Sequence, residues 1–130
     1  METWPKHLGT ALLVVVELFL VLDAGMKLLG AQAAVDATGE LGFSAQATRM
    51  LGLVLGAATI LYALPGTRVL GAILLTGYLG GAVAVQALHG APLLTHTLFG
   101  VYFGVAAWGA IWLRSHDLRA LVPLARRRTT

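Results

Sequence analysis

The segment from Leu8 to Leu29 constrains this chain most, because it is a long apolar run that carries three charged residues. Its length matches the roughly 20 residues with which an α-helix crosses the hydrocarbon core of a bilayer. Glu17, Asp23 and Lys27 all lie inside the run. A charged side chain within a membrane is costly unless it is paired or hydrated. One face of the predicted helix must therefore point into protein or water.

The three charges share that face. At about 100° per residue they fall within an arc of roughly 120°, with Lys27 between the two acids. Asp23 and Lys27 are spaced i,i+4, which allows them to pair directly. No basic residue of the predicted bundle shares the depth of Glu17. That carboxyl either handles a proton or a ligand, or is protonated and hydrogen-bonded to a neighbouring helix.

The composition indicates a membrane protein and excludes several kinds of chemistry. Of the 130 residues, 58% are hydrophobic and 12% are charged, whereas a soluble domain carries about 25% charged residues. There is no cysteine, which excludes disulfides, thiol catalysis, thiolate metal sites and iron–sulfur clusters. Walker and G-x-G-x-x-G sequences are absent too. The net charge of +3 does not indicate nucleic-acid binding, because the basic residues lie at segment ends.

Four apolar segments divide the chain, and we treat residues 1–130 as one transmembrane domain. All the prolines lie outside these segments or at their ends, where helices tolerate them. An A-x-A sequence at residues 31–33 resembles a signal-peptidase site, but Glu17 and Asp23 within the apolar run argue against cleavage. The sequence therefore predicts an all-α, integral membrane four-helix bundle, with spans at about 8–29, 46–64, 69–88 and 93–113.

The basic residues predict the orientation of these spans. With both termini in the cytoplasm, the outer side carries only Lys27 and Arg49 as basic residues, both at span ends. The positive-inside rule favours this N-in, C-in arrangement. It also indicates a multi-pass protein of the cell inner membrane. The cytoplasmic side then holds Lys6, Arg68, Arg114, Arg119 and the run Arg126, Arg127 and Arg128.

With this orientation, each helix contributes polar side chains to the outer half of the bundle. We therefore predict a polar pocket that is open to the outside, with Glu17 as its floor. As the alternative, Asp23 and Lys27 form an internal ion pair that only sets helix register, while Arg49 anchors at the headgroups. The histidines lack a ligand-spaced motif, so no metal site is predicted. The candidate residues are Glu17, Asp23, Lys27, Arg49, Gln86, His89 and His96.

Glycines spaced four residues apart recur in the last three predicted spans. Small residues at this spacing let helix backbones approach closely in lipid. We expect them to pack helices within the bundle or across a homodimer, rather than to border a ligand. The pairs are Gly52 and Gly56, Gly77 and Gly81, and Gly100 and Gly104.

The sequence resembles the DoxX-like family of small four-helix bacterial membrane proteins. The resemblance covers most of the chain, and its most specific parts are residues 48–52 and 70–82. Residues 23–27, His96 and residues 108–114 are also similar to the family. None of these stretches is a catalytic signature. The resemblance implies a four-helix membrane bundle. In broader relatives it implies a subunit of a thiosulfate:quinone oxidoreductase or a membrane partner in oxidative-stress complexes.

Three functions follow as hypotheses. The first is a membrane subunit that binds quinone or anchors a redox partner. No cofactor motif is visible, so a partner protein would supply the electrons, while the pocket would contact the quinone carbonyls and protons. The second is a structural or assembly factor whose charges only lock the bundle. The third is a small proton-coupled transporter that uses Glu17, in which case the chain would work as a dimer.

Overall fold

The computed structural model describes residues 3–122, and this part of the chain consists of helices and turns without a strand. Four helices are long, and three short ones follow or connect them. The elements are α1 (Trp4–Leu28), α2 (Gln32–Gly39), α3 (Ala45–Ala63), α4 (Arg68–Leu88), the π-helical turn η1 (Leu93–Thr97), α5 (Phe99–Arg114) and α6 (His116–Leu121). The predicted all-helical class is confirmed.

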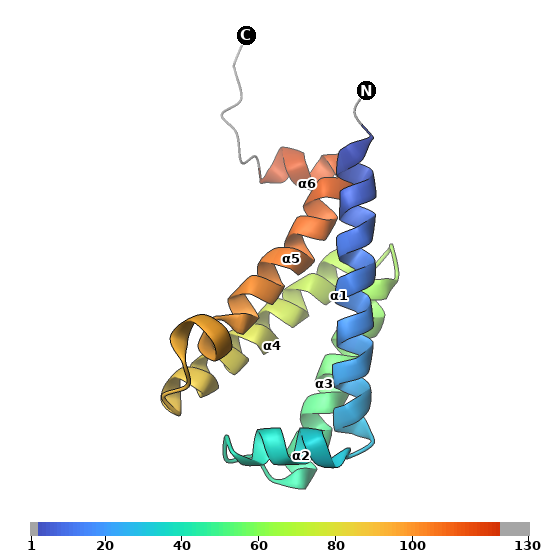
Figure 1. The fold of residues 1–130 in the computed structure, drawn as a ribbon. Helices are drawn as coiled ribbons and strands as arrows, with labels where there is room; N and C mark the ends of the chain where they lie inside the picture. Colours follow the sequence, from blue (N-terminus) through green and yellow to red (C-terminus); the bar gives the residue numbers. More distant parts are fainter. Residues whose placement is uncertain (1–2, 123–130) are drawn as a thin grey trace.

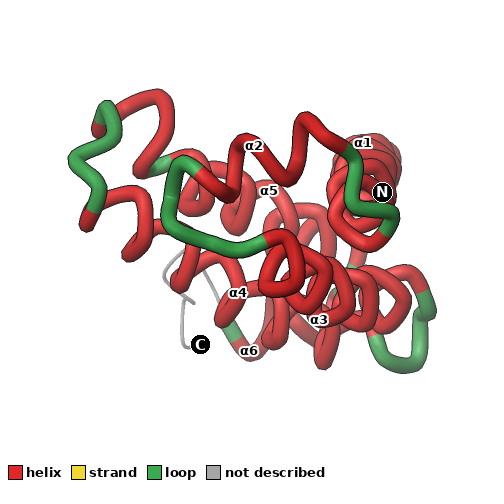
Figure 2. The backbone as a smooth tube through the Cα atoms, turned by 90° about the horizontal axis from the view of Figure 1, so that it is seen from below, coloured by secondary structure: helices red, strands yellow, loops and turns green. Residues whose placement is uncertain are grey.

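The long helices form two antiparallel pairs. α1 packs against α3, α4 packs against α5, and the contacts of α1 with α5 and of α3 with α4 close the ring. The pairs meet near the start of α1 and diverge toward the other end, where α2 lies (Figure 1). Seen from below, α2 extends across the opening between the pairs (Figure 2). The bundle is therefore closed at one end and open at the other.

Three helical segments of the described residues are long and apolar enough to cross a membrane. They are α1, α4 and the segment Leu93–Arg114, which comprises η1 and α5. The remaining long helix, α3, has 19 residues. Gln46 and Arg49 in its first turn lower its hydropathy below that of the other three.

Several boundaries differ from the sequence prediction. α1 begins at Trp4 rather than at residue 8, because Pro5 suits the first turn of a helix, whose N–H groups have no partner within the helix. Between the first two predicted spans, where no helix was predicted, α2 forms a helix of 8 residues. A hydrogen bond between the hydroxyls of Thr38 and Thr48 fastens α2 to α3.

The fourth predicted span is not one regular helix. The Pro92 carbonyl accepts hydrogen bonds from the backbone N–H groups of both His96 and Thr97, which widens the first turn. α5 then starts at Phe99. The short α6 was not predicted; it begins after Ser115, whose hydroxyl accepts a hydrogen bond from the Leu118 N–H at 3.2 Å and so caps the helix. The run Arg126 to Arg128 lies outside the described residues.

The core lies toward the closed end. Tyr62 of α3 is fully buried there, and its hydroxyl donates a hydrogen bond to the Ala107 carbonyl of α5 at 2.7 Å. This bond links two helices that make no other backbone contact in the described residues. A hydrogen bond of this kind contributes about 1 kcal/mol net, and losing it would leave a buried hydroxyl unpaired.

Two glycines allow the closest approaches to the backbone of a neighbouring helical segment. A Cβ atom at Gly71 would lie 2.3 Å from the Tyr62 backbone nitrogen, and one at Gly52 would lie 2.7 Å from the Leu28 nitrogen. The predicted packing role is confirmed for Gly52 and for Gly100, where a Cβ atom would lie 3.0 Å from the Leu79 carbonyl oxygen of α4. Gly77 and Gly81 differ, because a Cβ atom there would meet no heavy atom of the described chain within 4 Å. They line a cavity instead.

Gly71→Ala is expected to destabilise the bundle by about 2 kcal/mol, because the added methyl group collides with the backbone of α3. Gly80→Ala on the same helix is the matched control, since its added methyl group meets nothing within 4 Å. The control should be neutral, or stabilising by up to about 1 kcal/mol from helix propensity. The measurement is the free energy of unfolding in an SDS titration of mixed micelles. Equal effects of the two substitutions would contradict the close contact between Gly71 and the backbone of α3.

Candidate functional site: a cavity between the helix pairs

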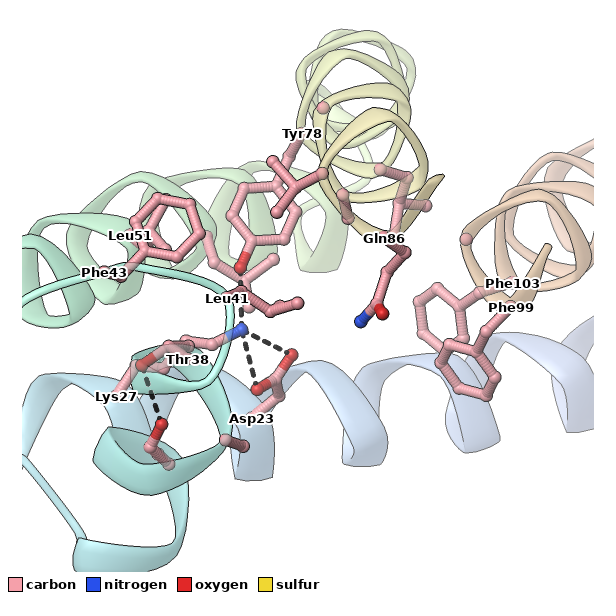
Figure 3. A pocket seen from close by; sticks show the side chains of 18 of the residues that line it. Asp23, Lys27, Thr38, Leu41, Phe43, Leu51, Tyr78, Gln86, Phe99 and Phe103 are labelled. Atoms are coloured by element: carbon pink, nitrogen blue, oxygen red, sulfur yellow. Dashed lines mark hydrogen bonds and ion pairs between the residues drawn. The ribbon is translucent and has the colours of Figure 1, made fainter. Parts of the chain in front are cut away.

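A cavity of about 660 Å³ lies where the two helix pairs diverge. Small-molecule sites in proteins usually measure about 300–1,000 Å³ and are mainly apolar with a few polar groups. The lining residues come from α1, α2, the loop before α3, α3, α4, η1 and α5. Figure 3 shows the cavity from close by, with polar groups on α1 and α4 and two phenylalanines on α5. The site thus has the size and lining of a ligand pocket.

An ion pair and a tyrosine form the polar part of the cavity. Lys27 Nζ lies 3.0 Å from Asp23 Oδ1, as the i,i+4 spacing predicted, and it donates a hydrogen bond to Tyr78 Oη at 2.7 Å. Asp23 and Lys27 belong to α1, and Tyr78 belongs to α4 (Figure 3). The ammonium also lies 5.3 Å from the centre of the Tyr78 ring, within cation–π range. These contacts bridge the two helix pairs across the cavity.

The Tyr78 hydroxyl keeps its hydrogen available. Because Lys27 donates to the oxygen of Tyr78, that hydroxyl can donate its own hydrogen to another acceptor. The structure records no such acceptor for Tyr78 among the described residues. A hydroxyl that accepts from an ammonium is polarised, which strengthens the hydrogen bond it donates in turn.

A second free polar group faces the same space. Gln86, in the last turn of α4, points its amide between the ion pair and the phenylalanines (Figure 3). Among the described residues, this amide has no hydrogen-bond partner. It offers two donors and one acceptor. The hydroxyl of Thr38, by contrast, already bonds to Ala34 and Thr48.

Three phenylalanines form the apolar part of the site between α1 and α5. The ring centre of Phe19 lies 4.9 Å from that of Phe103 and 5.7 Å from that of Phe99. Phe99 and Phe103 are 6.2 Å apart. These separations lie in the range of favourable aromatic pairs. We call Phe19, Phe99 and Phe103 the phenylalanine cluster.

The structure brings four of the seven predicted site residues to the cavity, namely Asp23, Lys27, Gln86 and His96. Arg49 is not among the lining residues. It lies beside the turn after α1, with Nη2 3.0 Å from where a Cβ atom at Gly30 would be. His89 also lies apart, exposed, with Nδ1 3.0 Å from the Val85 carbonyl oxygen of its own helix.

Glu17 does not form the floor of the cavity. It is absent from the lining residues, whereas the core residues Leu20 and Leu55 line the cavity and are almost fully buried. Glu17 lies one turn closer to the start of α1, and its Oε1 atom is buried without a hydrogen-bond partner among the described residues. The physical reason is the apolar packing of Leu20 between Glu17 and Asp23 on α1.

Neither the tyrosine nor the phenylalanine cluster was predicted from the sequence as part of the site. Tyr78 lies in an apolar span, where a tyrosine usually belongs to the core. Its position between Gly77 and Gly81 is the available signal, since both glycines border the cavity. The i,i+4 spacing of Phe99 and Phe103 places both rings on one face of α5. Their contact with Phe19 depends on the fold.

A bundle of apolar helices around a cavity with one polar part defines a small helical membrane protein. A sequence model of the DoxX-like family matches residues 11–110, and the chain therefore belongs to this family. The matched stretch includes every residue that lines the cavity. Neither the curated proteins nor the solved structures contain a significant match to the sequence.

Lys27→Met should destabilise the fold by about 1–3 kcal/mol, because Asp23 and the Tyr78 oxygen lose their partner in a half-buried place. Adding Asp23→Asn to this variant should restore part of the lost free energy of unfolding. A coupling energy on the order of 1 kcal/mol is expected, since the Asp23 side chain is 33% exposed and solvent screens the pair. A double-mutant cycle of unfolding free energies measures it. Lys6→Met, at an exposed position, is the control, with a change below about 0.5 kcal/mol; purely additive effects would refute the pairing.

Proposed function

We propose that this protein is a membrane subunit that binds a quinone and works with a redox-enzyme partner. The observation that carries the proposal is the Asp23–Lys27–Tyr78 network in a mainly apolar cavity of about 660 Å³. A quinone presents two carbonyl oxygens on an apolar ring. Such a molecule needs hydrogen-bond donors at its edge and apolar side chains against its faces. The cavity offers both.

The residues that would hold the quinone are those with free or shareable donors. The Tyr78 hydroxyl and the Gln86 amide have hydrogens available, and Lys27 carries a positive charge that favours electron-rich oxygens. A bound quinone would accept and carry two electrons and two protons. The chain itself has no cysteine and no cofactor motif, so electrons would come from the partner. The part played by Lys27, Asp23 and Tyr78 is to position the carbonyl and to share a proton along their hydrogen bonds.

In this proposal, the four long helices cross the inner membrane of the cell. α3 would be the fourth span, because it lies between α1 and α4 in the ring and is antiparallel to both. The start of α1 and the short α6 lie at the same end of the bundle (Figure 1), which agrees with an even number of crossings. Lys6, Arg68 and Arg119 would then lie on the cytoplasmic side.

Single cysteines test this N-in, C-in topology without background labelling, because the natural chain has none. Glu40→Cys, in the loop after α2, should react with a membrane-impermeant maleimide applied to spheroplasts of bacteria expressing the protein. His116→Cys, at the opposite end of the bundle, should react only after lysis. The His116 side chain is 89% exposed, so poor access would not explain its protection. The reverse pattern, or labelling of both before lysis, would refute the arrangement.

Tyr78→Phe should lower quinone affinity about fivefold, the equivalent of one net hydrogen bond. Tyr102→Phe is the matched control, because Tyr102 does not line the cavity and donates to the Leu94 carbonyl instead. Binding is measured by titrating a tailed benzoquinone into protein in nanodiscs. In parallel, the lipid extract of purified protein is analysed by mass spectrometry. Near-stoichiometric quinone supports the proposal; only phospholipid, together with no binding, would favour an assembly factor instead.

A further inference from the structure

The mouth of the cavity on the α1–α5 side is apolar and faces outward. Phe19, Leu22 and Phe99 line the cavity and yet are 41%, 63% and 45% exposed on the molecule. A side chain that both lines a cavity and reaches the outer surface lies at its mouth. In a helix that crosses a membrane, such an exposed apolar surface faces acyl chains. This mouth therefore opens toward the bilayer.

The phenylalanine cluster marks the inner edge of the mouth. Phe19 touches both rings of α5, whereas α1 makes no backbone contact with η1 in the described part of the chain. The two helix pairs thus separate beyond the cluster. His96 of η1 and Met26 of α1 line the cavity on the two sides of this gap.

The polar and apolar parts of the site follow one another along α1. Phe19 precedes Asp23 by four residues and Lys27 by eight, which corresponds to roughly 6 Å and 12 Å along the helix axis. The phenylalanine cluster therefore lies one to two turns nearer to the middle of the bundle than the ion pair. A molecule with its polar head at Lys27 and its tail at Phe19 would point the tail toward the interior of the bilayer, as a lipid does.

We propose that the ligand enters sideways from the bilayer between α1 and α5, and that its apolar tail lies across the phenylalanine cluster. The site then selects ligands by their tail as well as by their head. This inference rests on the proposed quinone function and adds the route and the tail specificity to it. The alternative is access from water at the α2 end. It is disfavoured because α2 extends over that opening and lines the cavity with three alanines, Ala33, Ala34 and Ala37, and with Thr38. The Thr38 hydroxyl is already hydrogen-bonded to Ala34 and Thr48.

The test compares two benzoquinones with the same ring, one with a long isoprenoid tail and one without a tail. Affinities are measured in nanodiscs, with concentrations expressed as mole fractions in the lipid. The wild-type protein should bind the tailed quinone about tenfold more tightly, and Phe19→Ala should remove most of this preference. In Phe19→Ala, affinity for the tail-less quinone should fall by a smaller factor than affinity for the tailed quinone. Phe99→Leu, which nearly conserves volume, is the second variant and should reduce the preference with little risk to folding.

Leu18→Ala is the matched control, because Leu18 neighbours Phe19 on α1, is 67% exposed and does not line the cavity. Its preference for the tailed quinone should equal that of the wild-type protein. Equal binding of the two quinones by wild-type protein would overturn the tail inference and leave the proposed function standing. If Phe19→Ala and Leu18→Ala weaken binding of the tailed quinone equally, the tail inference is likewise overturned and the proposed function still stands. Binding of neither quinone would overturn the proposed function itself.

Discussion

An ion pair inside a bundle of apolar helices determines how α1 is oriented and how the two helix pairs are joined. Asp23 and Lys27 would be costly on a surface that faces lipid, so α1 must turn that face toward other helices. Even there the pair needs a further partner, and Tyr78 of α4 supplies it at 2.7 Å from the ammonium. The interaction therefore fixes the rotation of α1 and ties the two helix pairs together at the end where they diverge.

The two ends of the bundle are stabilised in different ways. At the closed end, Gly71 brings the backbones of α3 and α4 into direct contact, and Tyr62 fills the space between α3 and α5. At the open end, the glycines Gly77 and Gly81 of α4 meet no other helix and leave room for a cavity. In α4, glycine therefore allows close helix packing in the first turn, and farther along the helix it leaves space for the cavity.

Close packing at one end and polar bridging at the other suit a site for a membrane-soluble ligand. The tight end gives rigidity, since its contacts are backbone to backbone and a buried hydrogen bond. The open end keeps donors on Tyr78 and Gln86 available, because no described residue accepts a hydrogen bond from either side chain. A ligand can supply the missing acceptors without breaking the packing of the core.

The helical class, the membrane setting and the Asp23–Lys27 pair could all be predicted from the amino-acid sequence. These follow from local properties: the length of apolar runs, the positions of prolines and an i,i+4 spacing. The sequence also marked four of the lining residues, because polar groups in apolar spans are conspicuous. Only the tertiary structure separated Glu17 from the cavity and joined Tyr78 and the phenylalanine cluster to it. Those relations depend on how far the two helix pairs diverge. That divergence is set by packing between residues that are distant in the sequence, and no local sequence pattern encodes it.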